Sequence, residues 1–118
     1  MLQPQLAKQF LNQSKDLFWV VDNNFLLIEA NQAYLSFMKE VAGVKKKLND
    51  SAFIETFGKE DIEKWRLHYK RALRGESFQI EEHFFNKRLH QIEYSQITFE
   101  PLINEKQEVF AVACQSKD

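Results

Sequence analysis

The side chains that could perform nucleophilic, acid–base or metal chemistry are few in this 118-residue chain. The single cysteine, Cys114, cannot form an internal disulfide, and in its apolar segment it behaves as a small hydrophobic side chain. Glu81 and Glu82 are adjacent in an alternating segment, so they face opposite sides of a strand and cannot share a proton. No nucleophile–base pair and no glycine-rich phosphate loop is visible. We therefore expect the domain not to be an enzyme.

The three histidines do not form a metal site. His68 falls in a helical segment, between an apolar stripe and a charged face, which is typical of a boundary residue. His83 and His90 fall in predicted strands with no other ligand at metal spacing near them. We predict no bound metal.

The charge balance and hydropathy of the chain exclude two classes of partner. Asp and Glu number 17 against 16 Lys and Arg, which leaves a formal net charge of −1. Such a domain has no basic excess for nucleic acid, and Lys45-Lys46-Lys47 is interpreted as a solvated loop. No stretch approaches the roughly 20 apolar residues of a membrane span, and the first residues lack signal-peptide features. We expect a cytoplasmic domain without membrane contact.

The elements that must position any site follow from periodicity and from turn residues. Apolar residues spaced three or four apart predict helices, and short runs rich in β-branched and aromatic residues predict strands. The order of these elements indicates an α+β fold with one antiparallel sheet of about five strands and helices on one face. Asn23-Asn24 is expected to supply the left-handed backbone of a hairpin turn. The predicted ranges are helices at 4–14, 31–40 and 59–74, one or two short helical turns within 44–58, strands at 17–22, 25–30, 78–85, 89–100 and 108–115, and a turn at 86–88.

The strand predicted at 89–100 contains a conflict of parity. Ile92 and Tyr94 point to one face, whereas Ile97 and Phe99 point to the other. Either a β-bulge lies near Ser95-Gln96, or one of the two pairs faces a partner surface.

The order of these features resembles a PAS domain over residues 15–118, preceded by a flanking helix at 1–14. The resemblance is strongest where an Asp ends the first strand and Asn-x-Ala-aromatic opens the following helix. The matching residues are Asp22, Asn31, Ala33, Tyr34, Gly43 and Pro101-Leu102. From the residues alone, Asn31 is interpreted as a helix cap and Asp22 as an acceptor for amides of the hairpin.

The resemblance implies a sensory or regulatory module of a signalling protein, with a two-component histidine kinase as the first candidate for its host. A signalling helix into the output domain would then begin near Asp118. Two alternatives stay open: a ligand-free PAS dimerisation scaffold, and a small α+β enzyme or binding protein outside the family. The helix at 4–14, through Leu6 and Phe10, packs either against a second copy or against its own sheet.

A cavity between the inner sheet face and the helices would be the ligand site of such a module. The candidate lining residues are Trp65, Tyr69, Ile80, Phe84, Ile97 and Phe99, which equally suit a plain core. An inward Gln79 or Gln96 would favour the pocket. The ligand is unknown. The Asn-Cys-Arg motif of photoreactive flavin members is absent, and the neighbours of His68 do not match a haem site, so both cofactors are disfavoured.

Overall fold

The computed structural model describes residues 4–86 and 89–117, except for the side chains of Pro4, Phe84 and Phe85. The predicted order of elements is confirmed, although positions 87–88 of the expected turn lie outside the described residues. In chain order the elements are α1 (Pro4–Gln13), β1 (Leu17–Asp22), β2 (Leu27–Ala30), α2 (Gln32–Glu40), the 3-10 turn η1 (Glu55–Phe57), α3 (Lys59–Leu73), β3 (Phe78–Asn86), β4 (Gln91–Ile103) and β5 (Val109–Lys117).

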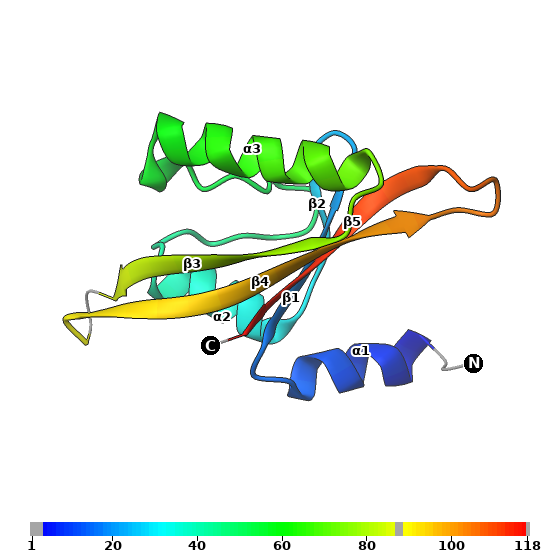
Figure 1. Ribbon diagram of the computed structural model, residues 1–118. Helices are drawn as coiled ribbons and strands as arrows, with labels where there is room; N and C mark the ends of the chain where they lie inside the picture. The colour runs from blue at the N-terminus through cyan, green and yellow to red at the C-terminus, as the bar shows by residue number, and fades with distance from the viewer. Residues whose placement is uncertain (1–3, 87–88, 118) are drawn as a thin grey trace.

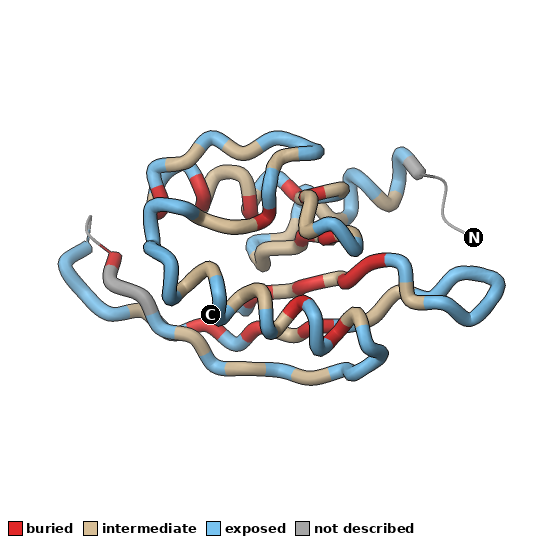
Figure 2. The backbone as a smooth tube through the Cα atoms, turned by 90° about the horizontal axis from the view of Figure 1, so that it is seen from above, coloured by how far each residue is buried: buried red, intermediate tan, exposed pale blue. Residues whose placement is uncertain are grey.

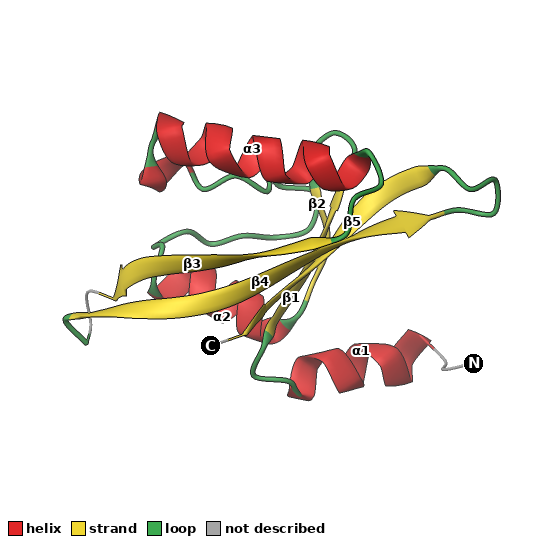
Figure 3. Ribbon diagram, viewed as in Figure 1, coloured by secondary structure: helices red, strands yellow, loops and turns green. Residues whose placement is uncertain are grey.

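The five strands form one antiparallel sheet in the order β2-β1-β5-β4-β3. The β1–β2 hairpin and the β3–β4–β5 meander are joined because β5 pairs with β1, so the last strand is the middle one. Helices α2 and α3 lie on the same face of the sheet, because Tyr34 of α2 stacks on Trp19, whose indole donates to Tyr69 of α3. Helix α1 lies apart from α3 near the N-terminus (Figures 1 and 3). The expected α+β architecture is thus confirmed. Among the described residues, no helix combines the length and apolar character needed to cross a bilayer.

The core lies between the sheet and these two helices. Alternate residues of β1, Trp19 and Val21, are buried against Val112 and Cys114 of β5, as period-two geometry requires. In Figure 2 the buried positions follow the central strands and the facing sides of the helices, whereas α1 is mostly exposed. Packing against the sheet therefore uses α2 and α3, and not α1.

The turn between β1 and β2 differs from the expectation. The left-handed residue is Phe25, with φ +62°, and not Asn23 or Asn24. The carboxylate of Asp22 accepts hydrogen bonds from the amides of Asn24 and Leu26, both at 2.9 Å. These two bonds hold the turn, so the position that must adopt positive φ is set by Asp22 and not by the local preference of asparagine. The returning strand accordingly begins at Leu27, later than predicted.

The parity conflict in β4 is resolved without a bulge near Ser95. The register of β3 against β4 runs unshifted from Phe78↔Phe99 to Asn86↔Gln91. Ile97 and Phe99 face the core, and Ile92 and Tyr94 lie on the opposite face with 57% and 59% of their surface exposed. The outward face of this strand therefore carries exposed apolar side chains.

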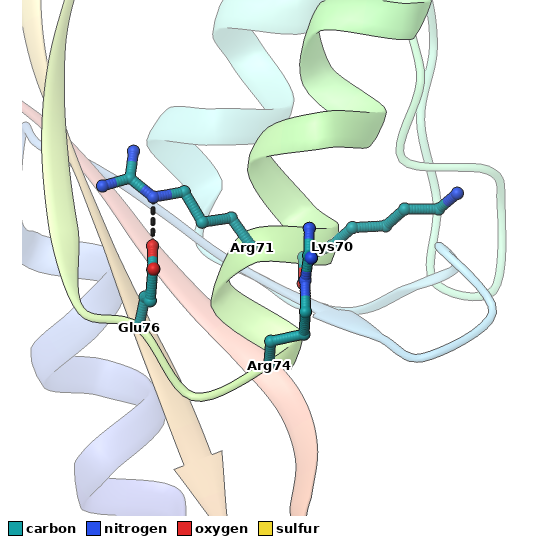
Figure 4. Close-up of polar contacts among 4 residues, drawn as sticks. All are labelled: Lys70, Arg71, Arg74 and Glu76. Atoms are coloured by element: carbon teal, nitrogen blue, oxygen red, sulfur yellow. Dashed lines mark hydrogen bonds and ion pairs between the residues drawn. The ribbon is translucent and has the colours of Figure 1, made fainter.

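The C-terminal end of α3 is fixed by local contacts (Figure 4). The Arg71 guanidinium pairs with Glu76 and lies 4.1 Å above the ring of Phe78. Arg74 Nε donates to the Lys70 carbonyl at 3.5 Å, and Gly75, with φ +102°, follows the end of the helix. These contacts set where α3 turns into β3.

Asn31 connects three parts of the chain. Its carbonyl oxygen accepts from the amides of Phe18 at 3.0 Å and Tyr34 at 3.1 Å. Its amide nitrogen donates to the carbonyls of Leu11 at 2.8 Å and Asp16 at 2.9 Å. The side chain is buried, and it caps α2 as predicted. It also ties the end of α1 and the start of β1 to that helix.

Replacing Asn31 should therefore be unusually destabilising for a polar substitution. We expect Asn31→Ala to lower the free energy of unfolding by about 2–4 kcal/mol, because it removes the cap and leaves buried amide and carbonyl groups unpaired. Urea unfolding followed by circular dichroism measures this loss. Asn24→Ala, in the exposed turn, should change stability by less than about 1 kcal/mol; equal effects of the two substitutions would contradict this role.

Candidate functional site

A cavity of about 500 Å³ lies between the inner face of the sheet, α2, η1 and the first half of α3. This volume falls within the range of small-molecule sites. Most of its wall is aromatic or aliphatic, and these side chains are Leu17, Trp19, Tyr34, Phe37, Met38, Val41, Ala42, Ala52, Phe53, Ile54, Phe57, Ile62, Trp65, Tyr69 and Ile97.

The structure distributes the six predicted lining residues between the wall and the core. Trp65, Tyr69 and Ile97 lie in the wall. Phe99 is fully buried beside it, and Ile80 packs against the same core without reaching the cavity. Phe84 belongs to β3, and its side chain is outside the described residues.

The aromatic wall is held by a hydrogen bond across the core. Trp19 Nε1 donates to the Tyr69 hydroxyl at 3.0 Å, which links β1 to α3. Tyr34 stacks on Trp19 with 5.0 Å between ring centroids, and Trp65 lies 5.8 Å from Tyr69. Burial raises the pKa of both Tyr34 and Tyr69, so both phenols are uncharged hydrogen-bonding groups. Sequence periodicity identified Trp65 and Tyr69 but not Trp19 and Tyr34, because it does not show which core rings border empty space.

One end of the cavity is polar. Glu82 of β3 lies on the inward face, and its carboxylate is 2.7 Å from Lys64 Nζ. Lys64 is also 3.7 Å from Asp61 in the first turn of α3. Burial raises the pKa of Asp61, an effect that Lys64 opposes and Glu82 reinforces. The structure therefore places Asp61 and Glu82 around one lysine.

The sequence signal for this polar end was available in the alternation of β3. Glu82 shares the parity of Ile80, so period two alone places it on the core side. Gln79 and Gln96, either of which would have favoured a pocket by pointing inward, are both exposed. The polar group that faces Glu82 across the strands is Ser95.

His83 is exposed beside Tyr94, at 5.9 Å between ring centroids, and is one of the residues that line the cavity. His68 and Cys114 have structural surroundings. His68 lies beside Phe99 at 5.5 Å between ring centroids, and burial lowers its pKa. Cys114 is buried, and burial raises its pKa, which leaves an unreactive thiol. Within residues 4–86 and 89–117, no group of three or more His, Cys, Asp or Glu side chains is placed to hold a metal ion. Asp22 and Asn31 bind backbone groups, and Asp118 is outside the described residues.

Known proteins resemble this chain in structure and not in sequence. No protein-family model matches it, and no curated protein matches it. Among solved structures, the Vibrio cholerae VqmA dimer, described as a LuxR-type receptor with a target DNA, is 15% identical with a TM-score of 0.74. That match covers the whole of this chain but only 52% of the VqmA chain, so this chain spans about half of that protein.

Two isolated PAS domains match over most of their own length. The PAS domain of a protein from Colwellia psychrerythraea is 14% identical with a TM-score of 0.65, and the match covers 97% of this chain and 94% of that one. The PAS domain of Bordetella pertussis BvgS is 12% identical with a TM-score of 0.60, covering 97% and 83%. Identities this low establish the fold alone. The five-stranded antiparallel sheet, the helices on one of its faces and these matches together show that the chain has the PAS fold.

Proposed function

We propose that this chain is the sensory module of a signalling protein and that it binds a small molecule in the cavity between the sheet and α3. The observation that carries the proposal is an aromatic-walled cavity of about 500 Å³ with a polar end, between the sheet and the helices. Sites of this volume, mostly apolar with a few polar groups, are typical of ligand binding. A protein with this fold, VqmA, has been solved bound to DPO. The proposal assigns binding to this chain and no reaction.

The position of β5 suggests how binding would be relayed. Ser116 of β5 lines the cavity and pairs with Leu17 at the start of β1. Its neighbour Gln115 donates to the carboxylate of Asp16 at 3.0 Å, next to the end of α1. A ligand that shifts Ser116 therefore acts at the point where the last strand, the first strand and the flanking helix meet. Ligand binding would change the population of two arrangements of these elements.

We also propose boundaries and a host for this module. In our proposal residues 1–14 are a flanking helix, residues 15–118 sense the ligand in the cytoplasm, and Asp118 marks the junction to an output domain. A histidine kinase of a two-component system is the first candidate for that output. A DNA-binding output is the second, because the VqmA structures include a complex with ligand and DNA.

Filling the cavity should abolish ligand binding. Ala52 is buried in the wall, so Ala52→Leu places extra bulk in the empty space. In a screen of small aromatic fragments by ligand-observed NMR, we expect the wild type to bind members of the set and Ala52→Leu to bind them at least about tenfold more weakly. Bound fragments should also shift the backbone amide signals of Cys114 and Ser116.

Ala113→Leu is the matched control. It adds the same bulk on the outward face of β5, where Ala113 pairs with Val20 and Glu100, and it should bind fragments as the wild type does. Fragment binding that survives in Ala52→Leu, or a wild type that binds none of the set, would contradict the proposed function.

A dimerisation scaffold is a second candidate function, and the exposed apolar side chains favour it. Leu6 and Phe10 of α1 are 51% and 73% exposed, so the apolar stripe of this helix does not cover its own sheet. Ile92 and Tyr94 add exposed apolar surface on the outward face of β4. Such surface is typical of a contact with another chain, and a second copy is the simplest partner.

Phe10→Ser tests this candidate. If α1 contributes to a dimer, the substitution should raise the dimer dissociation constant about tenfold or more, because it removes a large apolar side chain from the contact. Sedimentation velocity over a concentration series measures the change. Leu67→Ser, which alters an exposed leucine of α3, should leave the constant unchanged. A wild type that stays monomeric throughout the series would rule the candidate out.

A further inference from the structure

We propose that the cavity selects a small aromatic molecule that carries a positively charged amine. The carboxylates of Asp61 and Glu82 would receive the amine, and the aromatic wall would hold the body of the molecule. This inference rests on the proposed function, and it adds the chemical class of the ligand.

The first argument is the charge at the polar end of the cavity. Two carboxylates, Asp61 and Glu82, face a single ammonium, that of Lys64, at 3.7 and 2.7 Å. The amino end of α3 contributes roughly half a positive charge, which leaves the group acidic. Lys64 lies closer to Glu82, so the charge of Asp61 is the less compensated of the two. Lys64 is the one lysine or arginine among the described lining residues, which disfavours an anionic ligand.

The second argument is a pair of serine hydroxyl groups that line the cavity. Ser95 and Ser116 are only 7% and 8% exposed, lie on the inward sheet face and line the cavity. Neither hydroxyl forms a hydrogen bond with another side chain or backbone group of the described residues. No fully buried side-chain nitrogen or oxygen of the described residues lacks a partner, so these two hydroxyls keep some accessible surface and can bind a group that enters the cavity.

The arrangement of the acceptors suits an ammonium group in particular. Ser95 is the cross-strand partner of Glu82, and paired residues on one face have Cβ atoms about 5 Å apart. An alkylammonium carries three donor hydrogens and no acceptor. Asp61, Glu82 and Ser95 offer it oxygen acceptors from three elements: α3, β3 and β4.

The third argument is the composition of the wall. Trp19, Tyr34, Trp65 and Tyr69 all border the cavity, with 6.4 Å between the ring centroids of the two tryptophans. Indole and phenol faces attract cations and stack on flat aromatic bodies. The wall and the polar end therefore favour the same ligand class for independent reasons.

Three probes with one aromatic body and different charges test the proposal. They are 2-phenylethylamine, 2-phenylethanol and phenylacetate, titrated into the full chain and followed by amide chemical shifts. We expect the amine to bind about tenfold more tightly than the alcohol, since hydrogen bonds to charged groups are the stronger ones, and phenylacetate to bind most weakly.

Substitutions at the polar end should separate ligand binding from a general effect on structure. Glu82→Gln should weaken binding of 2-phenylethylamine about tenfold and leave the affinity for 2-phenylethanol unchanged. Lys64→Met should have the opposite effect and strengthen binding of the amine, because it removes the cation that competes for both carboxylates. Glu81→Gln is the matched control, since Glu81 is exposed on the opposite face of the same strand, and it should change neither affinity.

The outcomes distinguish the two proposals. Equal affinities for the amine and the alcohol, or tighter binding of phenylacetate, would overturn the inference about ligand class and leave the cavity as a binding site. Equal effects of Glu81→Gln and Glu82→Gln on amine binding would also overturn it. If none of the probes binds, this inference fails, and the fragment screen with Ala52→Leu decides the proposed function separately.

Discussion

The buried side chain of Asn31 is the constraint on which the arrangement of this domain depends. It satisfies the amides of Phe18 and Tyr34 and the carbonyls of Leu11 and Asp16 at once. An amide is the one uncharged side-chain group with an acceptor oxygen and two donor hydrogens, so no carboxylate or hydroxyl can replace it. Because these bonds fix α1, β1 and α2 relative to one another, they also fix the wall of the cavity that Trp19 and Tyr34 contribute.

The cavity is a consequence of how aromatic rings fill the space under α3. Trp19 and Tyr69 are tied by a hydrogen bond, and Phe99 packs behind them against Trp65. Rigid rings held in this way cannot collapse into the space beside them as flexible aliphatic side chains would. Under the proposed function, the same rigidity would let a bound molecule act on the central strand, because Ser116 of β5 borders the cavity.

Much of the fold could be predicted because it depends on local rules. The run of β-branched and aromatic residues placed β1 at its observed bounds, and the stripe around Trp65 and Tyr69 placed α3 within a residue. The turn at Phe25 could not be predicted from turn preferences, since the carboxylate of Asp22 determines it through two hydrogen bonds. The parity conflict in β4 was visible in the sequence, but only the unshifted register against β3 showed that Ile92 and Tyr94 face outward.

The sequence by itself determined the α+β class, the order of the elements and the capping role of Asn31, because periodicity and capping act over a few residues. Alternation separated Glu81 from Glu82 but was not used to assign Glu82 to the core side. Only the tertiary structure decided that Glu82 meets Asp61 and Lys64 at one end of a cavity. The physical reason is that a cavity, and the charges around it, depend on how α3 lies against β3 and β4. Side chains distant in the chain set that packing jointly, and no short pattern encodes it.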